Sequence, residues 1–151
     1  MSAIKWKIEP YQLKDHDALV DIWLRAVKQT HHFLDESDIS FFHKIVSEQA
    51  LSSCPVWQIK DQQEIPVGFI GIDQQKIEML FVEPDKHGHG IGSLLMDFAI
   101  KEHQVTAVDV NEQNVLAMAF YQKHGFEVIG RSPFDGTGRP FPILHMSLLS
   151  I

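Results

Sequence analysis

The apolar residues of the chain recur with two different periods, which predict alternating strands and helices. The spacing of one helix face appears in residues 19–27 and again in 91–99. Further helices are expected over Ser37–Leu51, with Ser37 or Asp38 as the N-cap, and over Asn114–His124, with Gly125 as the closing residue. Extended segments bounded by turn residues predict strands at Ile4–Glu9, Val56–Lys60, Pro66–Asp73, Ile77–Val82, Val105–Val110, Phe126–Arg131 and Pro142–Leu149.

The order of these elements indicates the fold class. Strands follow one another early in the chain and alternate with helices later, which predicts an α/β fold with a partly parallel, partly antiparallel sheet. The strand at Ile77–Val82 is apolar apart from Glu78, so we expect it to be buried on both faces. No repeat, low-complexity tract or Gly/Ser-rich linker divides the 151 residues. We therefore expect a single domain over residues 1–151.

Composition and charge exclude several classes of function. The formal net charge of −7 argues against general nucleic-acid binding and weakly favours a cationic acceptor such as an amine. We find neither a signal peptide nor an apolar run of membrane-spanning length. The single cysteine, Cys54, cannot form an internal disulfide, which suits a reducing cytoplasm. The expectation is a cytoplasmic protein that binds neither membrane nor nucleic acid.

A glycine-dense turn joins the strand at Ile77–Val82 to the helix that begins near Ile91. Gly88, Gly90 and Gly92 leave backbone N–H groups clear of side chains at the positive end of a helix, which favours binding of a pyrophosphate. A tight turn without a ligand is the alternative. The spacing fits neither a dinucleotide fingerprint, whose third glycine position holds Ser93, nor a P-loop, which needs a Lys here.

Two segments resemble the GCN5-related N-acetyltransferase (GNAT) family. The first, His87-Gly88-His89-Gly90-Ile91-Gly92, resembles the signature [QR]-x-x-G-x-[GA] of that family, with His87 in place of Arg or Gln. This departure could weaken affinity for coenzyme A or make it depend on pH, because histidine gains charge in mild acid. The second runs from Asn114 to Phe126 and matches N-x-x-A-x-x-[FL]-Y-x-K-x-G-F at every marked position. Residues 30–34 and 138–142 further resemble the bacterial YjaB-type branch of the family.

The resemblance implies a central mixed β-sheet flanked by about four helices, and transfer of acetyl from acetyl-coenzyme A to a primary amine of a small molecule or peptide. It implies that Tyr121 protonates the departing thiolate as general acid, and that backbone N–H groups near Phe81 and Val82 meet the oxyanion. The implied cofactor-binding residues are Phe81, Val82, His87, Gly88, His89, Gly90, Ile91, Gly92, Ser93 and Asn114. A non-catalytic acyl-coenzyme A binding or sensing module is the alternative function, and a monomer or a homodimer is expected.

Three residues are candidates for the general base. Glu78 stands at the strand position of the base in histone-acetylating members of the family, and a structural carboxylate is the alternative interpretation. His31 and His145 are candidates to line the acceptor pocket or to act as alternative bases, although the residue type alone favours a solvated or core-packed histidine at each position. The nine histidines are scattered without metal-ligand spacing, so no metal is expected.

Overall fold

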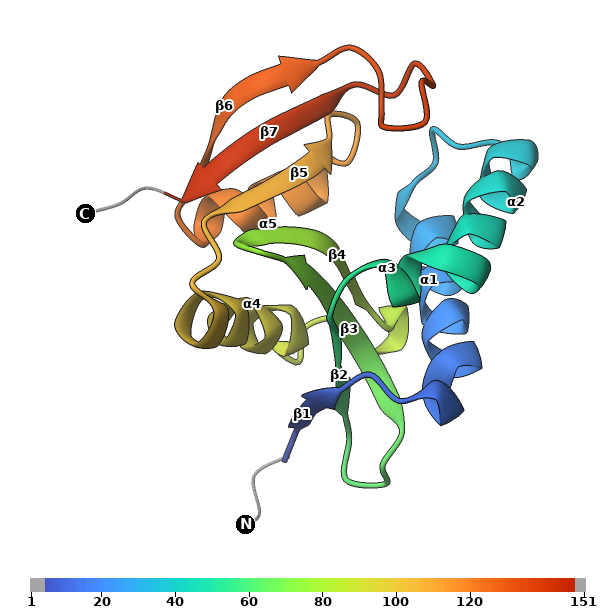
Figure 1. Cartoon of the computed structure of the whole chain (residues 1–151), viewed down its shortest axis with the longest axis vertical. Coiled ribbons are helices and arrows are strands. Elements are labelled where there is room, and N and C mark those ends of the chain that lie inside the picture. The colour runs from blue at the N-terminus through green and yellow to red at the C-terminus, as the bar shows by residue number, and fades with distance from the viewer. Residues whose placement is uncertain (1–4, 149–151) are drawn as a thin grey trace.

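The computed structural model of the protein describes residues 5–148 and contains a seven-stranded mixed sheet with helices on both faces (Figure 1). The strands are β1 Lys7–Pro10, β2 Val56–Lys60, β3 Pro66–Asp73, β4 Lys76–Val82, β5 Ala107–Asn111, β6 Phe126–Ser132 and β7 Ile143–Leu148. The helices are α1 His16–Thr30, α2 Glu36–Ile45, the single turn α3 Leu51–Ser53, α4 Ile91–His103 and α5 Val115–Lys123. The predicted α/β class and mixed sheet are confirmed.

The sheet divides between β4 and β5. Its strand order is β1-β2-β3-β4-β5-β7-β6, and every neighbouring pair is antiparallel except β4 and β5. These two parallel strands pair only at Lys76 with Ala107 and at Ile77 with Val108. Beyond Ile77 they diverge, so the carboxyl-terminal half of β4 has no strand beside it on that edge.

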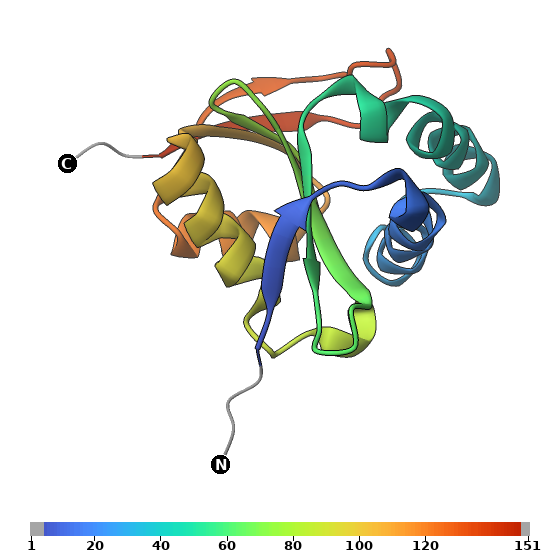
Figure 2. The ribbon, with the colours of Figure 1, turned by 60° about the horizontal axis from the view of Figure 1, so that its bottom comes forward.

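Two apolar clusters hold the helices against the sheet. Figure 2 shows α1 and α2 on one face and α4 and α5 on the other. Phe69 belongs to the cluster under α1, whereas its neighbour Ile70 belongs to the cluster under α4, because successive strand residues point to opposite faces. Both side chains are fully buried, which makes β3 the two-sided centre of the fold.

The expectation that β4 is buried on both faces is wrong. Only Ile77 of this strand is fully buried, and Glu78 is exposed. The reason is the divergence of β4 from β5, which opens this part of the sheet. Glu78 is therefore in contact with solvent and carries no cost of burial.

The second helix also differs from the prediction. Its N-cap is Asp35, whose side chain accepts a hydrogen bond from the N–H of Asp38 at 2.8 Å while the Asp38 side chain accepts from the N–H of Asp35. Asp38 is thus the third residue of a capping box rather than the cap. The helix ends at Ile45, and a π-helical turn at Val46–Ala50 replaces its expected last turn.

Other boundaries agree within a few residues. Asn114 caps α5, and Gly125 follows that helix with a φ of +97°, the left-handed geometry expected of a closing glycine. Ile4 and Leu149, at the ends of two expected strands, lie outside the described residues. No helix within residues 5–148 is long and apolar enough to cross a membrane.

Candidate active site

The glycine turn before α4 presents a group of free amides. Gly88 and Gly90 have φ values of +86° and +79°, and a Cβ added at either would meet no atom within 4 Å. Gly90 is the N-cap of α4, and no side chain caps this helix. The N–H groups of the first helical turn therefore face open space at the positive end of the helix dipole. This geometry fits a diphosphate.

A cavity of about 550 Å³ extends from this turn along the end of β4 to α5. Most of the residues that the family resemblance assigns to the cofactor line it, namely Phe81, Val82, His87, Gly88, Gly90, Ile91, Gly92, Ser93 and Asn114. His89 does not line it, and its ring instead packs edge-on against Trp6, with 6.4 Å between the ring centroids. Nothing in the local sequence indicated this contact, because Trp6 is far away along the chain.

Gly92 allows α5 to approach α4 closely. A Cβ at Gly92 would lie 3.3 Å from the ring of Phe120, so a side chain here would displace that ring. Phe120 in turn contacts Tyr121, and Tyr121 packs on Phe126, with ring centroids 5.5 and 6.0 Å apart. The glycine therefore helps to place Tyr121 in the wall of the cavity.

Tyr121 is a buried phenol that faces the cavity. Burial raises its pKa above the ordinary value, which keeps the hydroxyl protonated at neutral pH. Within residues 5–148 this hydroxyl has no protein hydrogen-bond partner, so it is free to donate to a bound molecule. A protonated, unshared donor suits the role of general acid.

The unpaired edge of β4 presents further amides. The N–H of Glu83 donates to the carbonyl of Val67 on β3 at 2.8 Å. Hydrogen-bonding direction alternates along a strand, so the N–H groups of Val82 and Leu80 point the other way, into the cleft. Of the two expected oxyanion donors, Val82 rather than Phe81 has this orientation.

A second cavity of about 130 Å³ lies where β4 and β5 diverge. Glu78 and Asp109 line it from the two strands. It meets the cofactor cavity at a common set of residues, His31, Leu80, Phe81, Asn114, Ala117 and Tyr121. Asp109 is held in an ion pair with Lys76, so Glu78 is the carboxylate that can attract a cation to this second cavity, on the side away from the glycine turn.

His31 stands at the junction of the two cavities. Its Nδ1 lies 2.7 Å from the hydroxyl of Thr30, which donates to the carbonyl of Ala26, also at 2.7 Å. Nδ1 is therefore the protonated nitrogen, and Nε2 is left as an acceptor beside the Asn114 amide at 3.4 Å. Burial, reinforced by the nearby His32, lowers the pKa of His31 to about 4, so the ring is neutral at pH 7.

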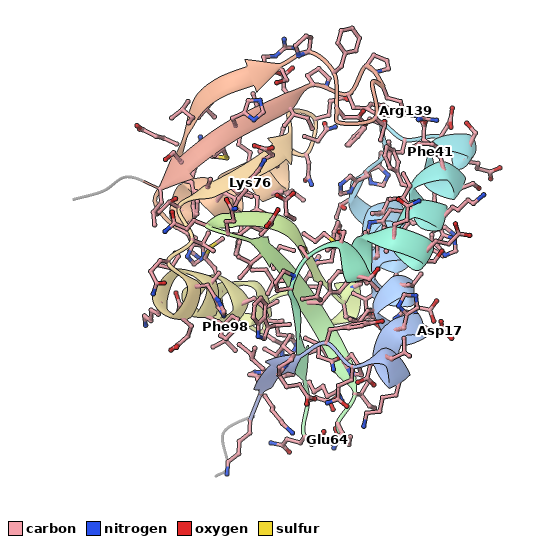
Figure 3. The ribbon with its side chains drawn as sticks, in the orientation of Figure 1. Asp17, Phe41, Glu64, Lys76, Phe98 and Arg139 are labelled. Carbon is pink, nitrogen blue, oxygen red and sulfur yellow. The ribbon has the colours of Figure 1, made fainter. Side chains whose placement is uncertain are left out.

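His145 lies elsewhere, on the open face of β5, β7 and β6. Its Nδ1 is 2.8 Å from Asp109, and its Nε2 is 2.6 Å from the hydroxyl of Ser132. Lys76 forms an ion pair with the other oxygen of Asp109 at 2.6 Å, and Figure 3 shows Lys76 on the adjoining strand. Burial favours a higher pKa for Asp109, but the hydrogen bonds from Lys76 and His145 hold it below its ordinary value. His145 lines neither of the two cavities that meet at Tyr121.

Sequence reasoning missed several residues of the cleft. Thr30 orients His31, and Lys86 and Lys123 bring positive charge to the wall of the cofactor cavity. Lys123 occupies the Lys position of the second motif, which was the available signal. No cluster of three or more His, Cys, Asp or Glu side chains suited to a metal ion occurs among residues 5–148.

Comparisons with known proteins agree with this geometry. The family model described as "Acetyltransferase (GNAT) domain" matches residues 30–148. The protein named peptidyl-lysine N-acetyltransferase YjaB of Salmonella typhimurium is 37% identical over 133 residues, covering 88% of this chain and 91% of that protein. The YjaB protein of Escherichia coli is 36% identical over 134 residues, covering 89% and 90%. The solution structure of apo YjaB from Escherichia coli superposes with a TM-score of 0.90 at 33% identity, over 97% of this chain and 99% of that one. The chain therefore belongs to the GNAT family of N-acetyltransferases and resembles its YjaB-type members.

Proposed function

We propose that this enzyme transfers the acetyl group of acetyl-coenzyme A to the side-chain amine of a lysine in a peptide or protein. The observation that carries the proposal is the meeting of two cavities at Tyr121, one beginning at the amide-lined glycine turn and the other lined by Glu78 and Asp109. The relatives named for peptidyl-lysine acetylation support this choice of acceptor. The net charge of −7 also suits a cationic one.

The first cavity is proposed to hold the coenzyme. The free amides at the start of α4 bind the diphosphate, and Lys86 and Lys123 add charge nearby. The cleft-facing N–H of Val82 stabilises the oxyanion that forms when the amine adds to the thioester carbonyl. When bound, acetyl-coenzyme A supplies the activated acetyl group.

Glu78 is proposed as the general base. Alkyl amines are mostly protonated at neutral pH, so an attacking lysine must first lose a proton. Glu78 lines the cavity through which the amine would arrive, and its exposure allows the proton to pass through water. His31 is a weak proton acceptor, since its pKa is about 4. Its neutral Nε2 instead accepts a hydrogen bond from the incoming amine and directs the nitrogen lone pair toward the carbonyl.

Tyr121 is proposed to complete the transfer. As the carbon–sulfur bond breaks, the buried phenol donates its proton to the departing thiolate of coenzyme A. Burial raises the pKa of Tyr121, which keeps the hydroxyl protonated at neutral pH and available to the sulfur as negative charge develops there.

The test is mass spectrometry on peptides, polyamines, amino acids and aminoglycosides incubated with acetyl-coenzyme A. We expect lysine peptides to gain one acetyl group and Tyr121→Phe to lower kcat by about a hundredfold or more. Tyr11→Phe is the matched control, because Tyr11 bonds to His16 away from the cleft. Glu78→Gln should lower kcat with little change in coenzyme A affinity. Binding of coenzyme A without modification of any acceptor would favour the non-catalytic acyl-coenzyme A sensing alternative.

A further inference from the structure

A third cavity, of about 200 Å³, adjoins the cleft between the segment that links α1 to α2 and the loop that links β6 to β7. The aromatic rings of Trp23, Phe33, Phe42, Phe81 and Phe141 line it together with aliphatic side chains. Its polar lining comes only from His31, Asn111 and Asp135 among the described residues. An apolar cavity of this kind holds water poorly and gains most from an apolar occupant.

The β6–β7 loop is fixed against α2, so this cavity has a defined wall. The Arg139 guanidinium lies 3.5 Å from the centre of the Phe41 ring and 3.7 Å from a carboxylate oxygen of Asp38. Figure 3 shows Arg139 and Phe41 close together where the loop approaches α2. Phe141, two residues after Arg139, packs against Phe33 with 5.7 Å between ring centroids.

This apolar cavity adjoins the place where the other two cavities meet. It shares His31 and Phe81 with both the cofactor cavity and the cavity between β4 and β5. Two cavities of different chemistry therefore adjoin the cofactor cavity at the same residues. One is lined by the carboxylates Glu78 and Asp109, and the other by aromatic rings.

We infer that the apolar cavity binds a large aliphatic or aromatic side chain of the acceptor, immediately before or after the acetylated lysine. This inference rests on the proposed function. The lysine amine enters the carboxylate-lined cavity while its neighbour fills the apolar one. The apolar cavity is open to solvent like the cofactor cleft, so a peptide side chain can enter it from outside with its backbone remaining at the surface. A longer acyl group would have to enter from the place where the three cavities adjoin, so the opening to solvent favours a peptide side chain as the occupant.

The test compares lysine peptides that differ only in one neighbour of the lysine, which is Leu or Phe in one series and Asn or Ser in the other. The rate of coenzyme A release, measured at saturating acetyl-coenzyme A, gives kcat/KM for each peptide. We expect the apolar series to be favoured about tenfold or more, the usual discrimination of a hydrophobic pocket. Ile143→Phe, which fills the cavity, and Phe141→Ala, which removes part of its wall, should both bring that ratio close to one. Phe134→Ala is the control, because Phe134 lies on the same loop but is 56% exposed and outside the cavity.

Three results would overturn the inference in distinguishable ways. Equal kcat/KM for the two peptide series would remove it and leave lysine acetylation standing. A preference for hexanoyl- over acetyl-coenzyme A that Ile143→Phe abolishes would assign the cavity to the acyl chain instead. If no peptide is acetylated while coenzyme A still binds, the proposed function fails and the inference fails with it.

Discussion

Replacing Gly90 with alanine tests whether the turn before α4 binds the diphosphate. Gly90 is the left-handed N-cap of that helix, with a φ of +79°. A methyl group here meets no protein atom within 4 Å, so packing does not resist the substitution. The methyl would instead occupy the space in front of the amides, where the phosphates are expected.

The cost to folding can be separated from the cost to binding. Holding a residue with a side chain in the left-handed region costs roughly 1–2 kcal/mol. If the backbone relaxes to avoid this strain, the first amides of α4 turn away from the ligand. Losing one hydrogen bond to a charged group costs about 1.5–3 kcal/mol. Since about 1.4 kcal/mol corresponds to a factor of ten, Kd for coenzyme A should rise about ten- to a hundredfold.

Gly138 provides the matched control. It has a φ of +83° and equally empty surroundings, but it lies in the β6–β7 loop. Gly138→Ala should therefore lower the urea midpoint about as much as Gly90→Ala and leave the calorimetric Kd for coenzyme A unchanged. If the two variants bind coenzyme A equally well, the glycine turn is only a strand-to-helix connection and the site is misassigned.

Three other predictions concern stability and the remaining histidines. Lys60 is 2% exposed and lies 3.0 Å from both Glu9 and Asp15. Lys60→Met should therefore cost about 3–5 kcal/mol in urea unfolding by removing the buried cation that these two acids share, and a loss below about 1 kcal/mol would contradict this. Folding lowers the pKa of His31 from 6.5 to about 4. Between these two pH values the ring is protonated only in the unfolded chain, so the free energy of unfolding decreases as the pH falls through this window. This pH-dependent loss of stability amounts to roughly 3 kcal/mol at most. In the variant His31→Gln, urea titrations at pH 4.5 and pH 7 should no longer show it. His145→Gln should change kcat less than about threefold, whereas a general base would give about a hundredfold.

Features encoded by local sequence were predictable. The glycine turn before α4 and the start of α5 at Asn114 depend on neighbouring residues, and both lie where expected. The N-cap of α2 was misplaced, because several suitable capping residues stand close together in the sequence. Asp35 is the cap, whereas Asp38 was one of the expected candidates.

Features that depend on long-range strand pairing were not predictable. Local patterns do not show that β7 inserts between β5 and β6, the arrangement that pairs His145 with Asp109. Nor do they show that β4 leaves β5 after Ile77, which is why Glu78 is exposed despite its apolar neighbours. The pairing partners of a strand, rather than its own composition, decided these positions.

Because the β4–β5 ladder ends early, binding of the coenzyme is linked to the stability of the folded protein. Backbone groups beyond Ile77 lack a strand partner on that edge, so a bound ligand that hydrogen-bonds to them would act as a substitute strand between the two halves of the sheet. Amide hydrogen exchange at Leu80 and Val82 should then slow on coenzyme A addition, and the melting temperature should rise with its concentration. A cell depleted of both coenzyme A and its thioesters would thereby also leave this enzyme easier to unfold and degrade.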